Sequence, residues 1–153
     1  STPLYSSAAS DVYKRQIEIT EINAIAKVYG IKNDQQTKKF FNSIIEVGTV
    51  SIAAKTAIAA LKNIPGINIG ASILNAIIAG SIIAAIGEGT TYIFKQIYLG
   101  KRSFEDIDWV TKVLQSKLSN EFIDKVKTII SKVGNQTDSK KTANLISAIF
   151  NND

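Results

Sequence analysis

The sequence predicts an all-α protein, a helical bundle built around a central apolar helical hairpin rich in glycine, alanine and isoleucine. Three observations lead to this class. Strand-like alternation of apolar and polar residues never persists for more than a few positions. Apolar residues instead recur every three to four positions, the spacing of one helix face. Residues 63–87 also form a run of 25 without a charged side chain, long enough to cross a bilayer or to form the centre of a bundle.

Composition removes several kinds of chemistry. The chain has no histidine and no cysteine, so disulfides, thiolate nucleophiles, Cys/His zinc sites and imidazole acid–base catalysis are excluded. We therefore expect no enzyme activity and no cofactor in this chain. The net charge of +5 is spread thinly and indicates a solvated basic surface or weak attraction to anionic surfaces. Nucleic-acid binding is not expected, because basic residues are not interleaved with aromatic ones on one face.

The first sixteen residues read STPLYSSAASDVYKRQ. The stretch 6–16 resembles the translation of a common transposase sequencing adaptor, and residues 1–5 fit its index region. We therefore predict that residues 1–16 are a disordered adaptor artefact and that the natural protein continues upstream of Ile17. A natural disordered N-terminus is the alternative. A signal peptide is excluded, because the segment has no apolar core.

Three predicted helices precede the apolar run. The first covers 17–29 and ends at Gly30. The second is capped by Asn33 or Asp34 and is interrupted or ended by Gly48. The third covers 50–61.

A turn at Ile64, Pro65 and Gly66 then reverses the chain, because proline disfavours helical geometry at the residue before it. We expect the run that follows to be helical and to fold back on its predecessor. Small residues spaced mostly four apart would let another helix or lipid approach closely. The predicted contact residues are Gly66, Gly70, Ser72, Ala76, Gly80, Ala84 and Gly87. Burial in protein and contact with a bilayer are both compatible with this pattern.

Beyond a glycine-rich step at 87–89, the helix is expected to resume through 92–98. Residues 101–153 are predicted to form a C-terminal amphipathic helical extension, with helices near 107–114, 122–130 and 142–150 and a polar linker at 135–141. Basic residues flank the apolar hairpin and are candidates for contact with lipid headgroups. They are Lys55, Lys62, Lys95, Lys101 and Arg102.

The sequence contains only weak candidates for a catalytic or ligand-binding site. Residues 100–103 are the stretch most similar to a phosphate-binding loop. They lack the upstream glycine and follow a predicted helix instead of a strand, so we reject a phosphate-binding loop here. Glu105, Asp106 and Asp108 are interpreted as acids at a helix start and not as metal ligands. Glu88, between two glycines, is either the polar end of the apolar helix or a partly buried functional carboxylate.

The stretch LKNIPGINIGASILNAIIAGSIIAAIGEG resembles the uncharacterised helical domain found C-terminal to Era-like (HSR-related) GTP-binding domains in bacteria. The matching elements are Lys62, the turn at 64–66, the apolar helix over 70–85 and the pair Gly87-Glu88, together with the upstream segment 25–30. Asn68 and Ile69 depart from the small or glycine-containing step that commonly follows this turn in the family.

The resemblance covers residues 17–100 and implies an accessory domain, truncated at its N-terminus. The GTPase domain, and with it GTP, would belong to the missing upstream part, and no catalytic residue is implied in this fragment. Such a module would associate with a membrane or a protein, including its own GTPase domain, in the bacterial cytoplasm or at the inner membrane. The alternative is a free-standing soluble helical bundle acting in protein–protein interaction. Homo-oligomer formation is compatible with either interpretation.

Overall fold

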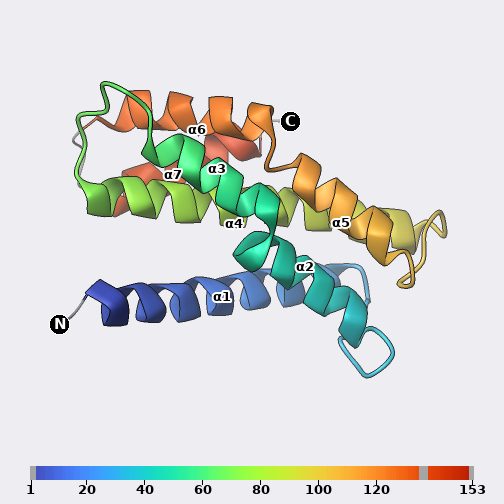
Figure 1. The fold of residues 1–153 in the computed structure, drawn as a ribbon. Coiled ribbons are helices and arrows are strands. Elements are labelled where there is room, and N and C mark those ends of the chain that lie inside the picture. Colours follow the sequence, from blue (N-terminus) through green and yellow to red (C-terminus); the bar gives the residue numbers. More distant parts are fainter. Residues whose placement is uncertain (1–2, 135–137, 152–153) are drawn as a thin grey trace.

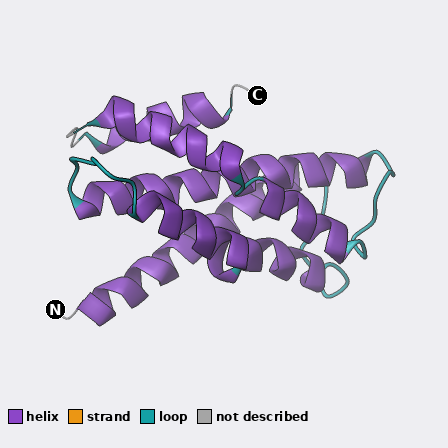
Figure 2. Ribbon diagram, turned by 45° about the horizontal axis from the view of Figure 1, so that its top comes forward, coloured by secondary structure: helices purple, strands orange, loops and turns teal. Residues whose placement is uncertain are grey.

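A computed structural model describes residues 3–134 and 138–151, and every described element is helical (Figures 1 and 2). The predicted all-α class is therefore confirmed over the described part of the chain. In chain order the helices are α1 (Pro3–Val28), α2 (Lys38–Val50), α3 (Ile52–Lys62), α4 (Ala71–Tyr98), α5 (Ile107–Ser116), α6 (Asn120–Val133) and α7 (Ser139–Phe150).

The central element is α4, which contacts each of the other helices. Its 28 residues give it a length of about 42 Å, enough to run through the whole bundle. In Figure 1, α1 lies on one side of α4, and α6 lies on the other. The predicted hairpin is present as well, because α3 and α4 pack against each other after the chain reverses between them.

Aromatic packing fixes the middle of the bundle. Phe40 and Phe41 of α2 contact Phe94 of α4, with ring centroids 5.5 and 5.8 Å apart, and Phe104 packs edge-on against Phe40. Phe40, Phe41 and Phe94 are almost fully buried. Contacts of this kind add to the free energy of area burial, so they hold α2 firmly on α4.

The N-terminus differs from the prediction of disorder at 1–16. Helix α1 begins at Pro3 and continues without interruption to Val28. Proline is well tolerated at the first helical position, and no glycine or further proline follows within the helix. The adaptor origin of this segment stays a prediction, and residues 1–2 lie outside the described residues.

The apolar run is not helical from residue 63. Residues 63–70 form a loop, and α4 starts only at Ala71. Gly66 has a φ of +79°, which confirms the predicted turn, and Gly70 is the extended N-cap residue of α4. Because Pro65 and the positive φ of Gly66 both oppose helical geometry, the loop extends further than predicted, and Gly66 and Gly70 do not lie on a helix face.

Two predicted glycine breaks are absent. Helix α2 continues through Gly48 to Val50, and α4 continues through Gly87, Glu88 and Gly89 to Tyr98. In each case a side chain from another helix occupies the space that a Cβ would need. The glycines therefore allow close packing, and that packing keeps the helices intact.

Candidate functional site

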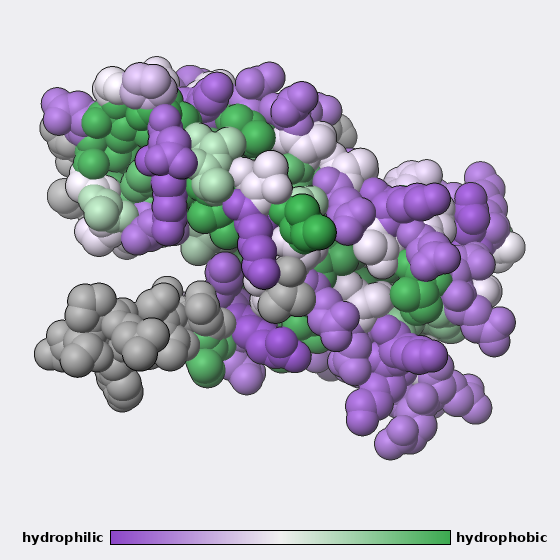
Figure 3. Space-filling view, in the orientation of Figure 1, coloured by the Kyte–Doolittle hydropathy of each residue, from purple (hydrophilic) through white to green (hydrophobic). Residues whose placement is uncertain are grey.

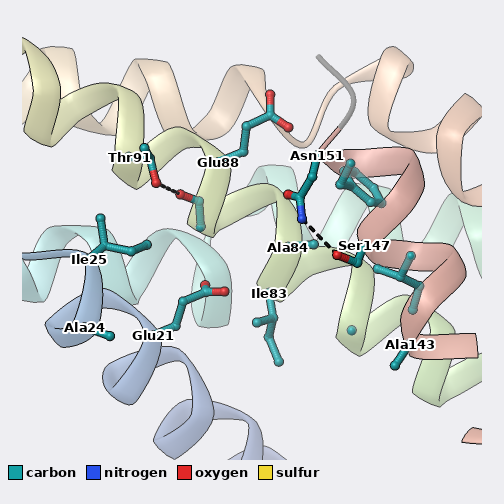
Figure 4. A pocket seen from close by; sticks show the side chains of 14 residues that line it. Glu21, Ala24, Ile25, Ile83, Ala84, Glu88, Thr91, Ala143, Ser147 and Asn151 are labelled. Atoms are coloured by element: carbon teal, nitrogen blue, oxygen red, sulfur yellow. Dashed lines mark hydrogen bonds between the residues drawn. The ribbon is translucent and has the colours of Figure 1, made fainter. Parts of the chain in front are cut away.

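A groove of about 640 Å³ runs between α1, α4 and α7 (Figure 4). Its α4 wall contains Gly80, Ile83 and Ala84, so it is mostly apolar. The α1 wall contributes Ala24, Ile25 and the carboxyl group of Glu21, and the α7 wall contributes residues between Ala143 and Asn151. No lysine or arginine of the described residues lines this groove.

Glu21 packs on a glycine of the central helix. A Cβ added at Gly87 would lie 2.8 Å from Oε1, Oε2 and Cδ of Glu21, so the carboxyl group occupies the place of a missing side chain. Its Oε1 atom is buried and has no hydrogen-bond partner among the described residues. Figure 4 shows this side chain reaching from α1 toward α4.

Glu18 repeats the arrangement one helical turn earlier, against α2. A Cβ added at Gly48 would lie 2.9 Å from Oε1 of Glu18. Glu18 is 0% exposed, and neither of its carboxyl oxygens finds a hydrogen-bond partner within the described part of the chain. Helix α1 thus packs on two helices through two carboxyl groups, one fully buried (Glu18) and one partly buried (Glu21).

Burial governs the ionisation of both acids. Desolvation raises the pKa of Glu18 from 4.5 to about 7, against the opposing attraction of Lys14 and Arg15. Desolvation also raises the pKa of Glu21 to about 7, and the charge of nearby Glu18 acts in the same direction. Both groups therefore change protonation near neutral pH.

Glu88 lies in the middle of α4, not at its end. Its carboxylate accepts a hydrogen bond from Nζ of Lys117 at 2.8 Å, and its side chain is 25% exposed. Of the two predicted alternatives, the partly buried position is the one observed. The ion pair ties α4 to the C-terminal end of α5, which gives Glu88 a structural partner.

The predicted small-residue ridge divides into two parts. Ser72 and Ala76, near the start of α4, are exposed. Gly80, Ala84 and Gly87 face other helices or the groove, and a Cβ at Gly80 would lie 3.1 Å from Cδ1 of Ile146 on α7. The C-terminal half of the ridge is therefore used for packing inside the bundle.

The five predicted headgroup contacts are all exposed, but they do not form one patch. Lys95, Lys101 and Arg102 gather at the C-terminal end of α4, whereas Lys55 and Lys62 lie on α3. The guanidinium of Arg102 stacks over the ring of Trp109, 4.8 Å from its centroid. The same end of α4 exposes Tyr92, Tyr98 and Leu99.

The sequence interpretation did not identify Glu18 and Glu21 as special. A signal was nevertheless available, because Glu18 is four residues before Ile22 and seven before Ile25, within the apolar stripe of its helix. An acid inside such a stripe indicates a buried carboxyl group. Gly48 and Gly87, on which these carboxyl groups pack, lie far away in the sequence and could not be assigned from it.

Comparison of the chain with protein families, with curated proteins and with solved structures finds no match. The resemblance to the helical domain that follows Era-like GTP-binding domains therefore stays a prediction.

Proposed function

We propose that this chain is an accessory helical module that associates with a membrane or a partner protein through the uncharged run at 63–87. One observation carries the proposal: other helices cover this run only in part. Ile64, Ile67 and Ile69 in the loop, and Ile83 in the groove, remain partly exposed. Apolar side chains left partly exposed next to one another can form an interaction site.

The loop end of the run forms an apolar surface of its own. Ile64, Ile67 and Ile69 pack beside Ile130 of α6 and line a crevice with Lys127. Figure 3 shows apolar side chains gathered at the end of the bundle where this loop lies. Apolar side chains bordered by lysine suit a boundary between hydrocarbon and headgroups.

Helix length and composition support membrane contact. Two stretches are long and apolar enough to span a bilayer, Lys38–Lys62 and Ala71–Tyr98. The first is two helices, α2 and α3, which change direction at Ser51. The second is α4, of whose most apolar window 39% is buried. The core helix of a soluble bundle meets the same criteria, so we propose contact at the membrane surface and not a fixed span.

On the basis of its resemblance to the helical domain that follows Era-like GTP-binding domains, we further propose that the chain is part of a larger GTP-binding protein. In that setting the chain would link a bacterial GTPase to the membrane, with GTP bound by the upstream domain. A free-standing soluble bundle acting in protein–protein interaction is the second candidate. It is favoured by the contacts of α4 with each of the other helices, which place α4 in the centre of the bundle.

Flotation with liposomes of mixed anionic and zwitterionic lipids tests the proposal. The wild-type chain is expected to float with the vesicles. The variant Ile83→Asp should stay in the soluble fraction, because it places a charge on the uncovered side of α4. Thr128→Asp adds the same charge at an exposed position on α6 and should float like the wild type.

A wild-type chain that stays soluble and monomeric beside the vesicles contradicts membrane association and favours the second candidate. Equal loss of flotation in the two variants would contradict the role of the α4 surface. Circular dichroism and thermal unfolding of each variant show whether the fold is retained.

A further inference from the structure

We propose that α1 is a proton-dependent clasp, closed on α2 and α4 when Glu18 and Glu21 are protonated and released when they ionise. Release would widen the groove between α1 and α7 and uncover more of α4. The release of α1 is argued from the packing of α1 alone. The further step, that this release controls contact with a membrane or a partner, rests on the proposed function.

The clasp is built from two matched contacts. Each carboxyl group fills the place of a missing Cβ, Glu18 at Gly48 and Glu21 at Gly87. Neither site supplies a hydrogen-bond partner for the buried carboxyl oxygens within the described residues. A neutral carboxyl group is tolerated there at moderate cost, whereas an ionised one loses much of its hydration and gains no hydrogen bond in exchange.

The surrounding charges do not remove this cost. On α1, Lys14 and Arg15 act on Glu18, while Glu18 and Glu21 repel each other once ionised. Helix α2 presents Gly48, which has no side chain. On α4 the neighbouring charge is Glu88, which is already paired with Lys117 of α5.

Among the residues that the structure describes, the α7 wall of the groove carries no charged side chain. Helix α7 lines it with Ala143, Ile146, Ser147, Phe150 and Asn151. Ionisation at both acids is therefore relieved most easily if α1 moves toward water.

The connection after α1 permits such a movement. Residues 29–37 lie outside regular helix, and Gly30 has a φ of +68° with nothing within 4 Å of an added Cβ. Figure 1 shows α1 at the edge of the bundle, joined to α2 by this loop. Helix α1 packs mainly against α2 and α4, the two helices that carry the glycine seats.

Distances across the groove test the clasp. Ala24 on α1 and Ala143 on α7 are exposed, line opposite walls of the groove and are labelled in Figure 4. The chain has no cysteine, so Ala24→Cys/Ala143→Cys can carry two spin labels for pulsed electron–electron distance measurement. At about pH 5.5 a single short distance is expected, and at about pH 8.5 a longer and broader distribution.

Two variants in the spin-labelled chain complete the test. Glu18→Gln/Glu21→Gln mimics the protonated carboxyls and should keep the short distance at both pH values. Glu46→Gln removes an exposed carboxyl on α2 and should respond to pH like the parent. An unchanged distance in the parent, or an equal pH response in the Glu18→Gln/Glu21→Gln chain, would overturn the clasp. Liposome flotation at the same two pH values separates the proposals, because failure to float at either pH contradicts the proposed function while the distances still report on α1.

Discussion

At Glu18 and Glu21, the residue that packs against each carboxyl group strongly affects its pKa. An exposed glutamate on a helix has a pKa near 4.5, so it is ionised at neutral pH and contributes little to stability. Here each carboxyl group lies over the backbone of a glycine on another helix, without a hydrogen-bond partner among the described residues. Burial then favours the neutral form, which raises the pKa of both groups to about 7.

Stability should therefore fall as pH rises through this interval. The unfolded carboxyl groups ionise near pH 4.5, whereas the folded ones stay protonated to about pH 7. The folded state thus binds more protons between these values, so the free energy of unfolding contributed by the pair is complete below pH 4.5 and decreases up to about pH 7. The raised pKa corresponds to a loss of roughly 3 kcal/mol for Glu18, and the partial exposure of Glu21 makes its own contribution smaller.

Urea unfolding measured at several pH values checks this expectation. The Glu18→Gln/Glu21→Gln chain should show a flatter profile than the wild type between these limits, and Glu46→Gln a profile like the wild type. A wild-type free energy of unfolding that rises over the same interval would contradict the assignment of these groups as buried and protonated.

At the scale of the elements, glycines of α4 allow side chains of neighbouring helices to pack directly against its backbone. Gly87 receives Glu21 of α1, and Gly89 receives Leu114 of α5. These contacts explain why α4 stays continuous where glycine would otherwise weaken it by about 1 kcal/mol per residue. The helix therefore depends on tertiary packing at the position where its own sequence is weakest.

Gly89→Ala is expected to destabilise the bundle despite the better helix propensity of alanine. The new Cβ would lie 2.7 Å from Cδ2 of Leu114 and 3.3 Å from Cγ of Lys117, and Leu114 is 0% exposed. Overpacking of this kind costs about 1–3 kcal/mol.

Gly80→Ala is the matched control, because its Cβ meets only the end of the Ile146 side chain, at 3.1 Å. We expect the two opposing effects nearly to cancel there. Chemical denaturation compares the two variants, and a Gly89→Ala chain as stable as the control would show that α5 can move away without cost.

At the scale of the whole molecule, the basic side chains that could contact a membrane form two separate groups. Lys95, Lys101 and Arg102 lie at the C-terminal end of α4, near exposed Tyr98 and Leu99. Lys55 and Lys62 lie on α3, and Lys62 ends that helix just before the isoleucine-rich loop. If the molecule lies along a membrane surface, both parts can contribute to binding.

Lys95→Gln/Lys101→Gln/Arg102→Gln is expected to weaken binding to anionic vesicles by about tenfold. Each basic side chain near an anionic surface contributes about 1 kcal/mol, and nearby acids at 105–108 reduce the total. Binding to zwitterionic vesicles should change little, because it depends on the apolar surface. Vesicle co-sedimentation at low and high salt measures both effects. An equal loss on the two kinds of vesicle would contradict an electrostatic role.

Much of the architecture follows from local sequence. Apolar spacing indicates a helix wherever a strong periodic segment occurs, and Pro65-Gly66 marks the reversal before the central helix. These features are readable because helix periodicity and turn chemistry depend on residues a few positions apart. The groove, by contrast, brings together α1, α4 and α7, which are far apart along the chain.

The sequence by itself determined the all-α class, the turn and the long uncharged run. Only the tertiary structure decided that Gly48, Gly87 and Gly89 lie inside continuous helices, and that the carboxyl groups of Glu18 and Glu21 pack on glycines of other helices. The physical reason is the same in each case. A glycine can break a helix or admit a neighbour, and an acid can face water or a helix backbone. Which alternative has the lower free energy depends on what packs against that residue.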